Sequence, residues 1–298
     1  RFAELCERKG EAERARRYRS VRDELAANLD AHAWDGQWYR RVFTDGGQWF
    51  GSVHNDECRI DAISQSWSVI SRMAPEDKML KAMQSFDREL VDRELSVVRL
   101  LNPPFDRTEP KPGYIQGYPP GIRENGAQYT HGIVWSVVAW CMLGEGGKAF
   151  ELFNMLNPLT HTRTPGDARR YAKEPYVIAA DVYMTDVQKG RAGWTWYTGA
   201  AGWMYQAGIE WILGLRRCGD RLYIRPCIPH EWPGFTARYR YGSASYEIVV
   251  DNTASKGGAP TSLTVDGREV DWAGHGTENG PFIELRDDGR VHHVAVTL

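Results

Sequence analysis

Gly117-Tyr-Pro-Pro-Gly-Ile-Arg-Glu-Asn-Gly-Ala-Gln-Tyr-Thr-His131 runs directly into the apolar segment 130–143. A segment that is apolar nearly throughout predicts a buried helix rather than a surface one. The two prolines and three glycines of the loop before it fix the backbone path, so the ionisable residues of the loop are held in place. A second loop, Gly190-Arg-Ala-Gly-Trp-Thr-Trp-Tyr-Thr-Gly199, has the same character. Two such loops predict one ligand site that is assembled from both.

Outward from these loops, the chain up to about residue 215 follows a helical period. Apolar residues recur at spacings of three and four over 11–31, which predicts an amphipathic helix. These residues are Ala15, Tyr18, Val21, Leu25 and Leu29. Further helices are expected over 61–73, 78–97, 148–155 and 200–215. Long helices joined by long loops fit a helical barrel better than a bundle, because bundles have short connections.

After Cys218 the pattern becomes that of short strands. The candidate strands are rich in β-branched or aromatic residues and are separated by Gly, Asp and Pro. They cover 222–228, 235–241, 245–250, 262–265, 282–285 and 292–298. This spacing predicts a small antiparallel β-sandwich that begins near residue 216. The expected fold class is therefore mostly α with a C-terminal β domain.

The composition of the 298 residues narrows the function. A net charge of -2 leaves no basic face for nucleic acid, and no apolar run approaches the ~20 residues that span a bilayer. Five cysteines without paired or metal-type spacing indicate reduced thiols in the cytoplasm. Twelve tryptophans and fourteen tyrosines are unusually many for a chain of this length. Aromatic faces contact the C–H faces of sugar rings, although most tryptophans fill cores.

Two helix starts carry candidate anion ligands. His131 begins the buried helix, where it is either a packed core histidine or a donor that faces an anion together with the free N–H groups of the helix. Thr198 and Gly199 precede the next apolar helix, and a hydroxyl followed by a glycine N–H suits phosphate. A Thr-Gly pair is a weak signal alone, but it lies beside the aromatic residues 194–197.

The other candidates are carboxylates, an arginine and a tryptophan in loops. Arg123 and Glu124 form either an ordinary surface ion pair or, in so stiff a loop, a clamp for sugar hydroxyls. Asp181, Glu57 and Trp196 are weaker candidates for substrate contact. The sequence contains no metal-type cluster, Walker loop or nucleophile elbow.

Several long motifs together resemble glycoside hydrolase family 94, the inverting sugar phosphorylases. They are Ala33-Trp-Asp-Gly-Gln-Trp38, Tyr118-Pro-Pro-Gly-Ile-Arg-Glu-Asn125, Glu174-Pro-Tyr-Val177, Trp196-Tyr-Thr-Gly-Ala-Ala-Gly-Trp-Met204 and Ile224-Arg-Pro-Cys-Ile-Pro229. The branch that they resemble most is the C-terminal phosphorylase-like domain of cyclic β-1,2-glucan synthases. The resemblance extends over essentially the whole chain.

The resemblance implies an (α/α)6 barrel, represented by its later helices in 1–215, and a β-sandwich cap in 216–298. It implies phosphorolysis of a β-glucosidic bond with inversion to give α-glucose 1-phosphate, and the resemblance to the glucan synthase branch implies that the bond is β-1,2. His131, Thr198 and Gly199 fall at the phosphate-binding positions of the family, and Arg123 and Glu124 fall where the acceptor sugar is held. No cofactor is implied, because inorganic phosphate is a co-substrate. The partners implied are a β-glucan oligosaccharide, phosphate or glucose 1-phosphate, and the remaining parts of the parent protein.

One departure from the family pattern concerns catalysis. The general acid of the family is an Asp in a Trp-Asn-Asp motif, and no Trp-Asn-Asp occurs in this sequence. We therefore expect the acid upstream of Arg1, in a parent that is expected to be an inner-membrane protein with this domain on the cytoplasmic side. We expect the 298 residues alone to be inactive or nearly so. Two other functions stay open. One is a non-catalytic glucan-binding module, and the other is an inverting hydrolase that uses Glu57 or Glu124 as its base.

Overall fold

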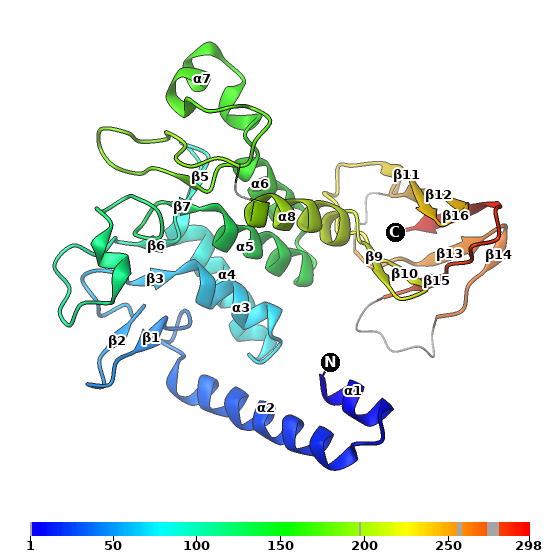
Figure 1. The fold of residues 1–298 in the computed structure, drawn as a ribbon, viewed down its shortest axis with the longest axis horizontal. Helices are drawn as coiled ribbons and strands as arrows, with labels where there is room; N and C mark the ends of the chain where they lie inside the picture. The colour runs from blue at the N-terminus through cyan, green and yellow to red at the C-terminus, as the bar shows by residue number, and fades with distance from the viewer. Residues whose placement is uncertain (1, 197, 255–257, 273–279) are drawn as a thin grey trace.

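A computed structural model of the chain describes residues 2–196, 198–254, 258–272 and 280–298. It consists of a helical region followed by a C-terminal β region (Figure 1). The predicted fold class is confirmed at this level. Within the described residues, no helix is both long and apolar enough to cross a membrane.

Helix α5 (Thr130–Met142) is the centre of the helical region (Figure 1). Nearly all of its residues are buried, as its apolar sequence predicts. Helices on several sides cover it: α3 (Ala62–Ile70), α4 (Glu76–Leu90), α6 (Gly146–Leu156), α8 (Thr198–Gln206) and the π-helix η3 (Ala207–Ile212). The predicted helices over 61–73, 130–143 and 148–155 are therefore confirmed to within a few residues.

Asp61 fixes the start of α3. Its carboxylate accepts hydrogen bonds from the backbone N–H groups of Ile63 at 2.8 Å and Ser64 at 3.3 Å, which satisfies two helix-start donors. The other carboxylate oxygen pairs with the guanidinium of Arg41, although Asp61 is almost completely buried. A charge buried this deeply is retained only when it is paired and hydrogen-bonded.

Two of the predicted helices end earlier than expected. The helix expected over 78–97 ends at Leu90, because Val91–Asp92 (β4) and Val97–Val98 (β5) form an antiparallel hairpin. The helix expected over 200–215 is divided between α8 and η3, and its last residue, Leu215, begins strand β9 (Leu215–Cys218). The β-branched pair of valines at 97–98 is the local reason for the first difference.

The helix predicted over 11–31 is present as α2 (Ala12–His32), but its apolar stripe is not covered. Tyr18, Val21, Leu25 and Leu29 are each between 42% and 51% exposed. Of this stripe only Ala15 is buried. Figure 1 shows α2 at the edge of the helical region, with α1 (Phe2–Arg8) folded against it.

Short elements join the helices and build the loops. They are β1 (Val42–Phe43), β2 (Trp49–Phe50), β3 (Ile60–Asp61), β6 (Leu101–Asn102), η1 (Tyr114–Gly117), β7 (Gln128–Tyr129), η2 (Thr160–Thr162), α7 (Pro165–Tyr171) and β8 (Asp181–Val182). The pairing of β7 with β8 matters for function, because it aligns Tyr129, just before α5, with Asp181.

The β region consists of two sheets. One has three strands in the order β15 (Phe282–Glu284), β10 (Arg221–Ile224) and β9. The other has five strands in the order β11 (Gly234–Tyr241), β12 (Ala244–Asp251), β16 (Val291–Thr297), β13 (Ser262–Val265) and β14 (Arg268–Glu269). Buried residues of both sheets belong to one hydrophobic core, so the sheets face each other as in a sandwich.

The expectation of an antiparallel sandwich is wrong for one pair of strands. β12 and β16 pair in parallel, with Ser245 opposite Val291 and Asp251 opposite Thr297. Between β14 and β16 the chain passes through β15 in the other sheet. A strand that returns by such a crossover is not bound to the antiparallel direction of a hairpin. The alternation of buried and exposed residues along both strands is the same as in an antiparallel sheet.

The helical and β regions share the hydrophobic core, and a glycine permits their close contact. Gly214 lies between η3 and β9 with a φ of +69°. A Cβ atom added there would lie 2.0 Å from the carbonyl oxygen of Arg225, whose N–H donates to the Gly214 carbonyl at 2.9 Å. Any side chain at 214 therefore separates the turn after η3 from the chain after β10.

Gly214→Ala is expected to lower the free energy of unfolding by at least about 3 kcal/mol, because a backbone clash is added to a left-handed φ. Gly219→Ala is the matched control, since Gly219 has a φ of +65° and open space around it. It should cost only about 1–2 kcal/mol. Urea denaturation followed by tryptophan fluorescence measures both, and equal losses for the two variants would contradict the role given to Gly214.

Candidate functional site

His131 and Gly199, predicted from two separate loops, lie against each other. A Cβ atom built on Gly199 would be 3.6 Å from both Nδ1 and Cε1 of the imidazole. His131 is in the first turn of α5, and Gly199 is in the first turn of α8. Thr198 begins α8, but its side chain lies outside the described residues, as does Tyr197. Two helix N-termini thus meet beside one histidine.

Tryptophans surround the imidazole. The ring centroid of His131 is 5.2 Å from that of Trp135 and 6.3 Å from that of Trp203. Trp67 of α3 extends the group by an edge contact with Trp135 at 5.4 Å. These tryptophans were not among the predicted site residues. The spacing could have identified two of them, because Trp135 and Trp203 follow His131 and Gly199 by four residues on the same helix faces.

Burial lowers the pKa of His131, so its imidazole is neutral at pH 7. A neutral imidazole offers one N–H donor and one acceptor nitrogen. An anion next to it favours the protonated form, in which both nitrogens donate. The arrangement of one histidine and two helix starts is therefore suited to a small oxyanion.

The loop that carries Arg123 and Glu124 is rigid, as its sequence predicts. The Asn125 side chain exchanges hydrogen bonds with the backbone of Phe105, at 2.7 and 2.8 Å, and donates to the carbonyl of Tyr118 at 2.8 Å. Gly121 has a φ of +82° and lies so close to Met184 that a Cβ atom would be 2.7 Å from its carbonyl carbon. The loop is thereby fastened to the chain that follows β8.

Arg123 is held in place by aromatic rings. Its guanidinium carbon is 4.3 Å from the ring centroid of Trp194 and 6.0 Å from that of Tyr118. Its own backbone has a φ of +48°, an uncommon conformation for a residue with a side chain. Trp194 belongs to the second predicted loop. The Arg123–Trp194 contact therefore joins the two loops, and the ligand site that they are expected to share stays a prediction.

Asp181 also connects the same two loops, through hydrogen bonds to the backbone of each. Its carboxylate accepts hydrogen bonds from the backbone N–H of Trp194, at 3.1 Å, and from that of Arg123. Gly193 makes room for it, because a Cβ atom there would be 2.2 Å from the Asp181 Oδ1. Burial raises the pKa of Asp181, and the nearby charge of Glu124 adds to the effect.

Three carboxylates in this area have one buried oxygen each that lacks a hydrogen-bond partner among the described residues. These atoms are Oδ2 of Asp181, Oε2 of Glu124 and Oε2 of Glu174. Buried polar atoms are rarely left unpaired, because each costs about 1–3 kcal/mol. Carboxylate oxygens without donors suit a ligand that brings hydroxyl groups.

Trp196 lies in the second loop and is exposed. Its side chain is 68% accessible, and that of Tyr176, its neighbour at a centroid distance of 6.5 Å, is 77% accessible. Trp196 has a φ of +65°, so the backbone is strained to present it. Its predicted contact with substrate stays a prediction.

Glu57 forms hydrogen bonds within the protein. Its carboxylate accepts hydrogen bonds from the backbone N–H groups of Asp106, Arg107 and Thr108 and from the Thr108 hydroxyl. Burial raises the pKa of Glu57, but these hydrogen bonds outweigh it, so the net pKa lies below the usual value. A carboxylate that is engaged in this way is a poor base and fastens the loop at 106–108 instead.

The described residues contain no group of three or more His, Cys, Asp or Glu side chains that could hold a metal ion. The groups gathered at the starts of α5 and α8 are a histidine, carboxylates, an arginine and aromatic rings. Such a set suits a sugar and an inorganic oxyanion.

Comparison with known proteins agrees with this chemistry. Residues 1–214 match the catalytic domain of the glycosyl hydrolase 94 superfamily, and residues 215–271 match the C-terminal domain of glycosyl hydrolase family 65. The chain is 48% identical, over 232 residues, to the cyclic beta-(1,2)-glucan synthase NdvB of Rhizobium meliloti (strain 1021). This match covers 78% of the chain and 8% of the synthase.

Phosphorylases are similar at lower identity. Solabiose phosphorylase of Paenibacillus borealis is 30% identical over 272 residues, which are 91% of the chain and 34% of that enzyme. N,N'-diacetylchitobiose phosphorylase of Vibrio proteolyticus is 32% identical over 254 residues, which are 83% of the chain and 31% of that enzyme. The chain thus spans about a third of these phosphorylases and less than a tenth of the synthase. Because the catalytic-domain match covers most of its length, the chain belongs to the glycosyl hydrolase 94 superfamily.

Proposed function

We propose that this chain is the C-terminal portion of a carbohydrate phosphorylase domain that acts on β-glucosidic bonds. Inorganic phosphate attacks the anomeric carbon, the glucosidic bond to the leaving oxygen breaks, and α-glucose 1-phosphate forms with inversion. The observation that carries the proposal is the contact between His131 and Gly199, which joins two helix N-termini at one point.

Phosphate fits this point for electrostatic reasons. Each helix start supplies N–H donors and the positive end of a helix dipole, and both favour a negative charge. His131 is neutral without a ligand because burial lowers its pKa, and a phosphate beside it stabilises its protonated form. Thr198 and Gly199 at the start of α8 complete the proposed phosphate site, Thr198 on the strength of its sequence position.

The sugar is proposed to lie on the side of Arg123, Glu124 and Asp181. The unpaired carboxylate oxygens of Glu124 and Asp181 accept hydrogen bonds from sugar hydroxyls, which lifts the cost of burying them. Arg123, fixed by the Trp194 ring, donates to other hydroxyls. A β-1,2-linked glucan is the proposed substrate, and its support is the similarity to a cyclic beta-(1,2)-glucan synthase.

One acid completes the chemistry, because the leaving oxygen needs a proton while phosphate replaces the activated water of an inverting hydrolase. We assign this acid to another part of the parent protein. No cofactor takes part in the proposed reaction, in which inorganic phosphate is a co-substrate.

The exposed apolar stripe of α2 supports the proposal that another part of the parent protein packs against this helix. Tyr18, Val21, Leu25 and Leu29 form one apolar helix face that is about half exposed, although Phe2 of α1 contacts Tyr18. We propose that the remaining barrel helices of the catalytic domain cover it, because α2 is part of the region that matches that domain.

A non-catalytic glucan-binding module is the second candidate, and the exposed Trp196 and Tyr176 favour it. Such a module has no use for an oxyanion pocket, so dependence on phosphate separates the two functions. A hydrolase that uses Glu57 as its base is disfavoured, because Glu57 is engaged with the loop at 106–108.

His131→Ala combined with Thr198→Ala is expected to raise the KM for phosphate by roughly 100-fold or more, since two ligands of a charged group are removed. The assay is release of α-glucose 1-phosphate by a longer chain that includes the family's Trp-Asn-Asp segment. Glucan affinity should change less than about twofold. His54→Ala, an exposed histidine, is the control and should leave both quantities unchanged. A parallel loss of glucan binding and turnover would refute the phosphate assignment.

Asp181→Asn is expected to stabilise the fold and impair turnover. The pKa of Asp181 is raised in the folded protein, so the folded state binds its proton more tightly than the unfolded state does. The stabilising contribution of this carboxyl is therefore present at low pH and is lost as the pH rises through the folded pKa. The amide stays neutral, so the variant should gain about 1 kcal/mol at pH 7 and nothing near pH 3.

Urea denaturation at several pH values measures this difference. Asp186→Asn, on the exposed chain after β8, is the control and should show no gain that depends on pH. A stability loss for Asp181→Asn that is equal at all pH values would contradict the assignment of burial as the dominant effect.

The 298 residues by themselves are expected to release glucose 1-phosphate at least about 100-fold more slowly than the longer chain, because acid catalysis contributes roughly 10²–10⁴-fold. Both chains are assayed with β-1,2-gluco-oligosaccharides and phosphate. Equal rates would show that the acid lies within the 298 residues.

A further inference from the structure

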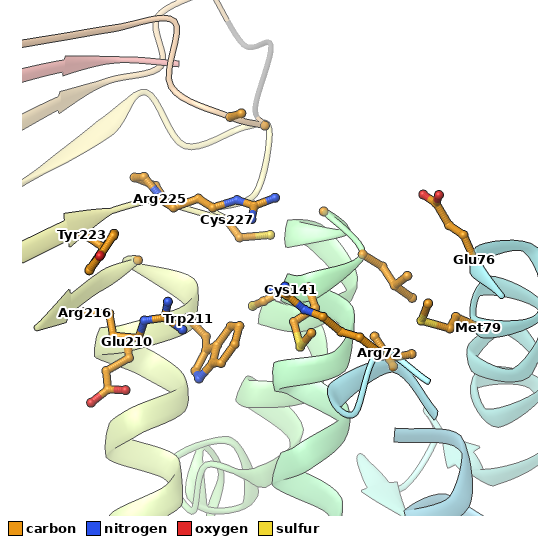
Figure 2. A pocket seen from close by; sticks show the side chains of 18 residues that line it. Arg72, Glu76, Met79, Cys141, Glu210, Trp211, Arg216, Tyr223, Arg225 and Cys227 are labelled. Carbon is orange, nitrogen blue, oxygen red and sulfur yellow. The ribbon is translucent and has the colours of Figure 1, made fainter. Parts of the chain in front are cut away.

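A cavity of about 380 Å³ lies where the helical and β regions meet, at the opposite end of α5 from His131. The end of α5, η3, β10 and the chain after β10 contribute to its wall (Figure 2). Two cysteines, Cys141 of α5 and Cys227 of the connection between β10 and β11, line it together. Neither takes part in the proposed reaction.

The two thiols are in contact. A hydrogen bond joins the side chains of Cys141 and Cys227, and the two residues keep 7% and 9% of their surface accessible. The backbone holds them there, because the Cys227 N–H donates to the Ile212 carbonyl at 2.9 Å. Gly146, in the first turn of α6, lies so close to Ile228 that a Cβ atom would be 2.4 Å from its carbonyl oxygen. The cysteines are thus neighbours in space although they are far apart in the chain.

Positive side chains outnumber negative ones around the cavity, because three arginines and two glutamates, Glu76 and Glu210, line it. Arg72, Arg216 and Arg225 line the same cavity, and Figure 2 shows Arg72 and Arg225 on the wall that carries the two cysteines. The hydrogen bond from the Cys141 thiol, together with the charge of Arg225, lowers the pKa of Cys227. Burial raises the pKa of Cys141, which therefore keeps its proton and donates it. Thiols of lowered pKa next to arginines are the reactive ones.

The other three cysteines of the chain, of which Cys6 is buried, lack this combination. Cys58 is completely buried, and burial together with the charge of Asp61 raises its pKa. Cys218 is exposed. Only the Cys141–Cys227 pair, among the described cysteines, unites thiol contact, arginines and an opening to a cavity.

We infer that Cys141 and Cys227 form an oxidation site that a peroxide converts into a reversible disulfide. The Cys227 thiolate attacks one oxygen of hydrogen peroxide, the O–O bond breaks, and the thiolate becomes a sulfenic acid while hydroxide leaves and takes up a proton as water. The Cys141 sulfur then attacks the sulfenic sulfur, an S–S bond forms, and a second water leaves. Two thiols and one peroxide thus give one disulfide and two waters.

The disulfide connects the end of α5 to the β region. Between residues 141 and 227 the chain passes through α6, α7, α8 and η3, so the bond closes a loop that contains the proposed phosphate residues of α8. Oxidation therefore ties the junction of the two regions covalently.

The test treats the 298-residue chain with hydrogen peroxide, blocks free thiols with N-ethylmaleimide and digests it with trypsin without reduction. The expected product is the peptide 124–148, with Cys141, cross-linked to the peptide 222–238, with Cys227. Dithiothreitol should separate them. Before oxidation, N-ethylmaleimide should label Cys227 at least about 10-fold faster than Cys58.

Cys58→Ser is the matched control and should leave the cross-link intact. Cys141→Ser should abolish it and leave Cys227 as a sulfenic acid that dimedone traps; Cys141→Ala serves if the serine variant does not fold. The inference is overturned if the wild-type digest contains no 141–227 cross-link while Cys218 is oxidised, or if Cys58 reacts as fast as Cys227.

Discussion

The near-complete burial of α5 is the constraint on which the rest of the structure depends. A helix that is apolar on every face has no side to turn toward water, so neighbouring elements must cover all of it. α3, α6, α8 and η3 do this, and the sheets join the same core. Because this packing holds α5 in place, the residues at its two ends are held in place as well. These are His131 at the N-terminal end and Cys141 at the C-terminal end.

At its N-terminal end, α5 brings His131 to the start of α8. Several features near His131 are energetically unfavourable. Asp181 is buried with one oxygen unpaired, and Arg123 and Trp196 have left-handed backbones. Each feature costs free energy that the hydrophobic core must offset. Such costs collect at sites that bind ligands, because a preformed site avoids ordering its groups when the ligand arrives.

Glycines and an asparagine, more than ion pairs, set the geometry of this site. Gly193 leaves room for the carboxylate of Asp181, Gly121 lets the Arg123 loop touch the chain after β8, and Asn125 fastens that loop by its side chain. The ion pairs at the surface of the chain contribute much less, since exposed pairs are worth little. The same division holds at the junction, where Gly214 and Gly146 admit the backbone that carries Cys227.

The sequence by itself determined the helices and strands whose period is strong, the buried state of α5, and the two loops that meet at His131 and Gly199. Period, proline and glycine act locally, so a single sequence is enough to read them.

Prediction from the sequence failed where tertiary contacts decide the structure. The parallel pairing of β12 with β16 arose from a crossover between sheets. The engagement of Glu57 with the loop at 106–108 was equally invisible, as were the tryptophans around His131 and the meeting of Cys141 with Cys227. These features depend on which distant segments pack together, and only the burial of apolar surface in three dimensions selects those segments.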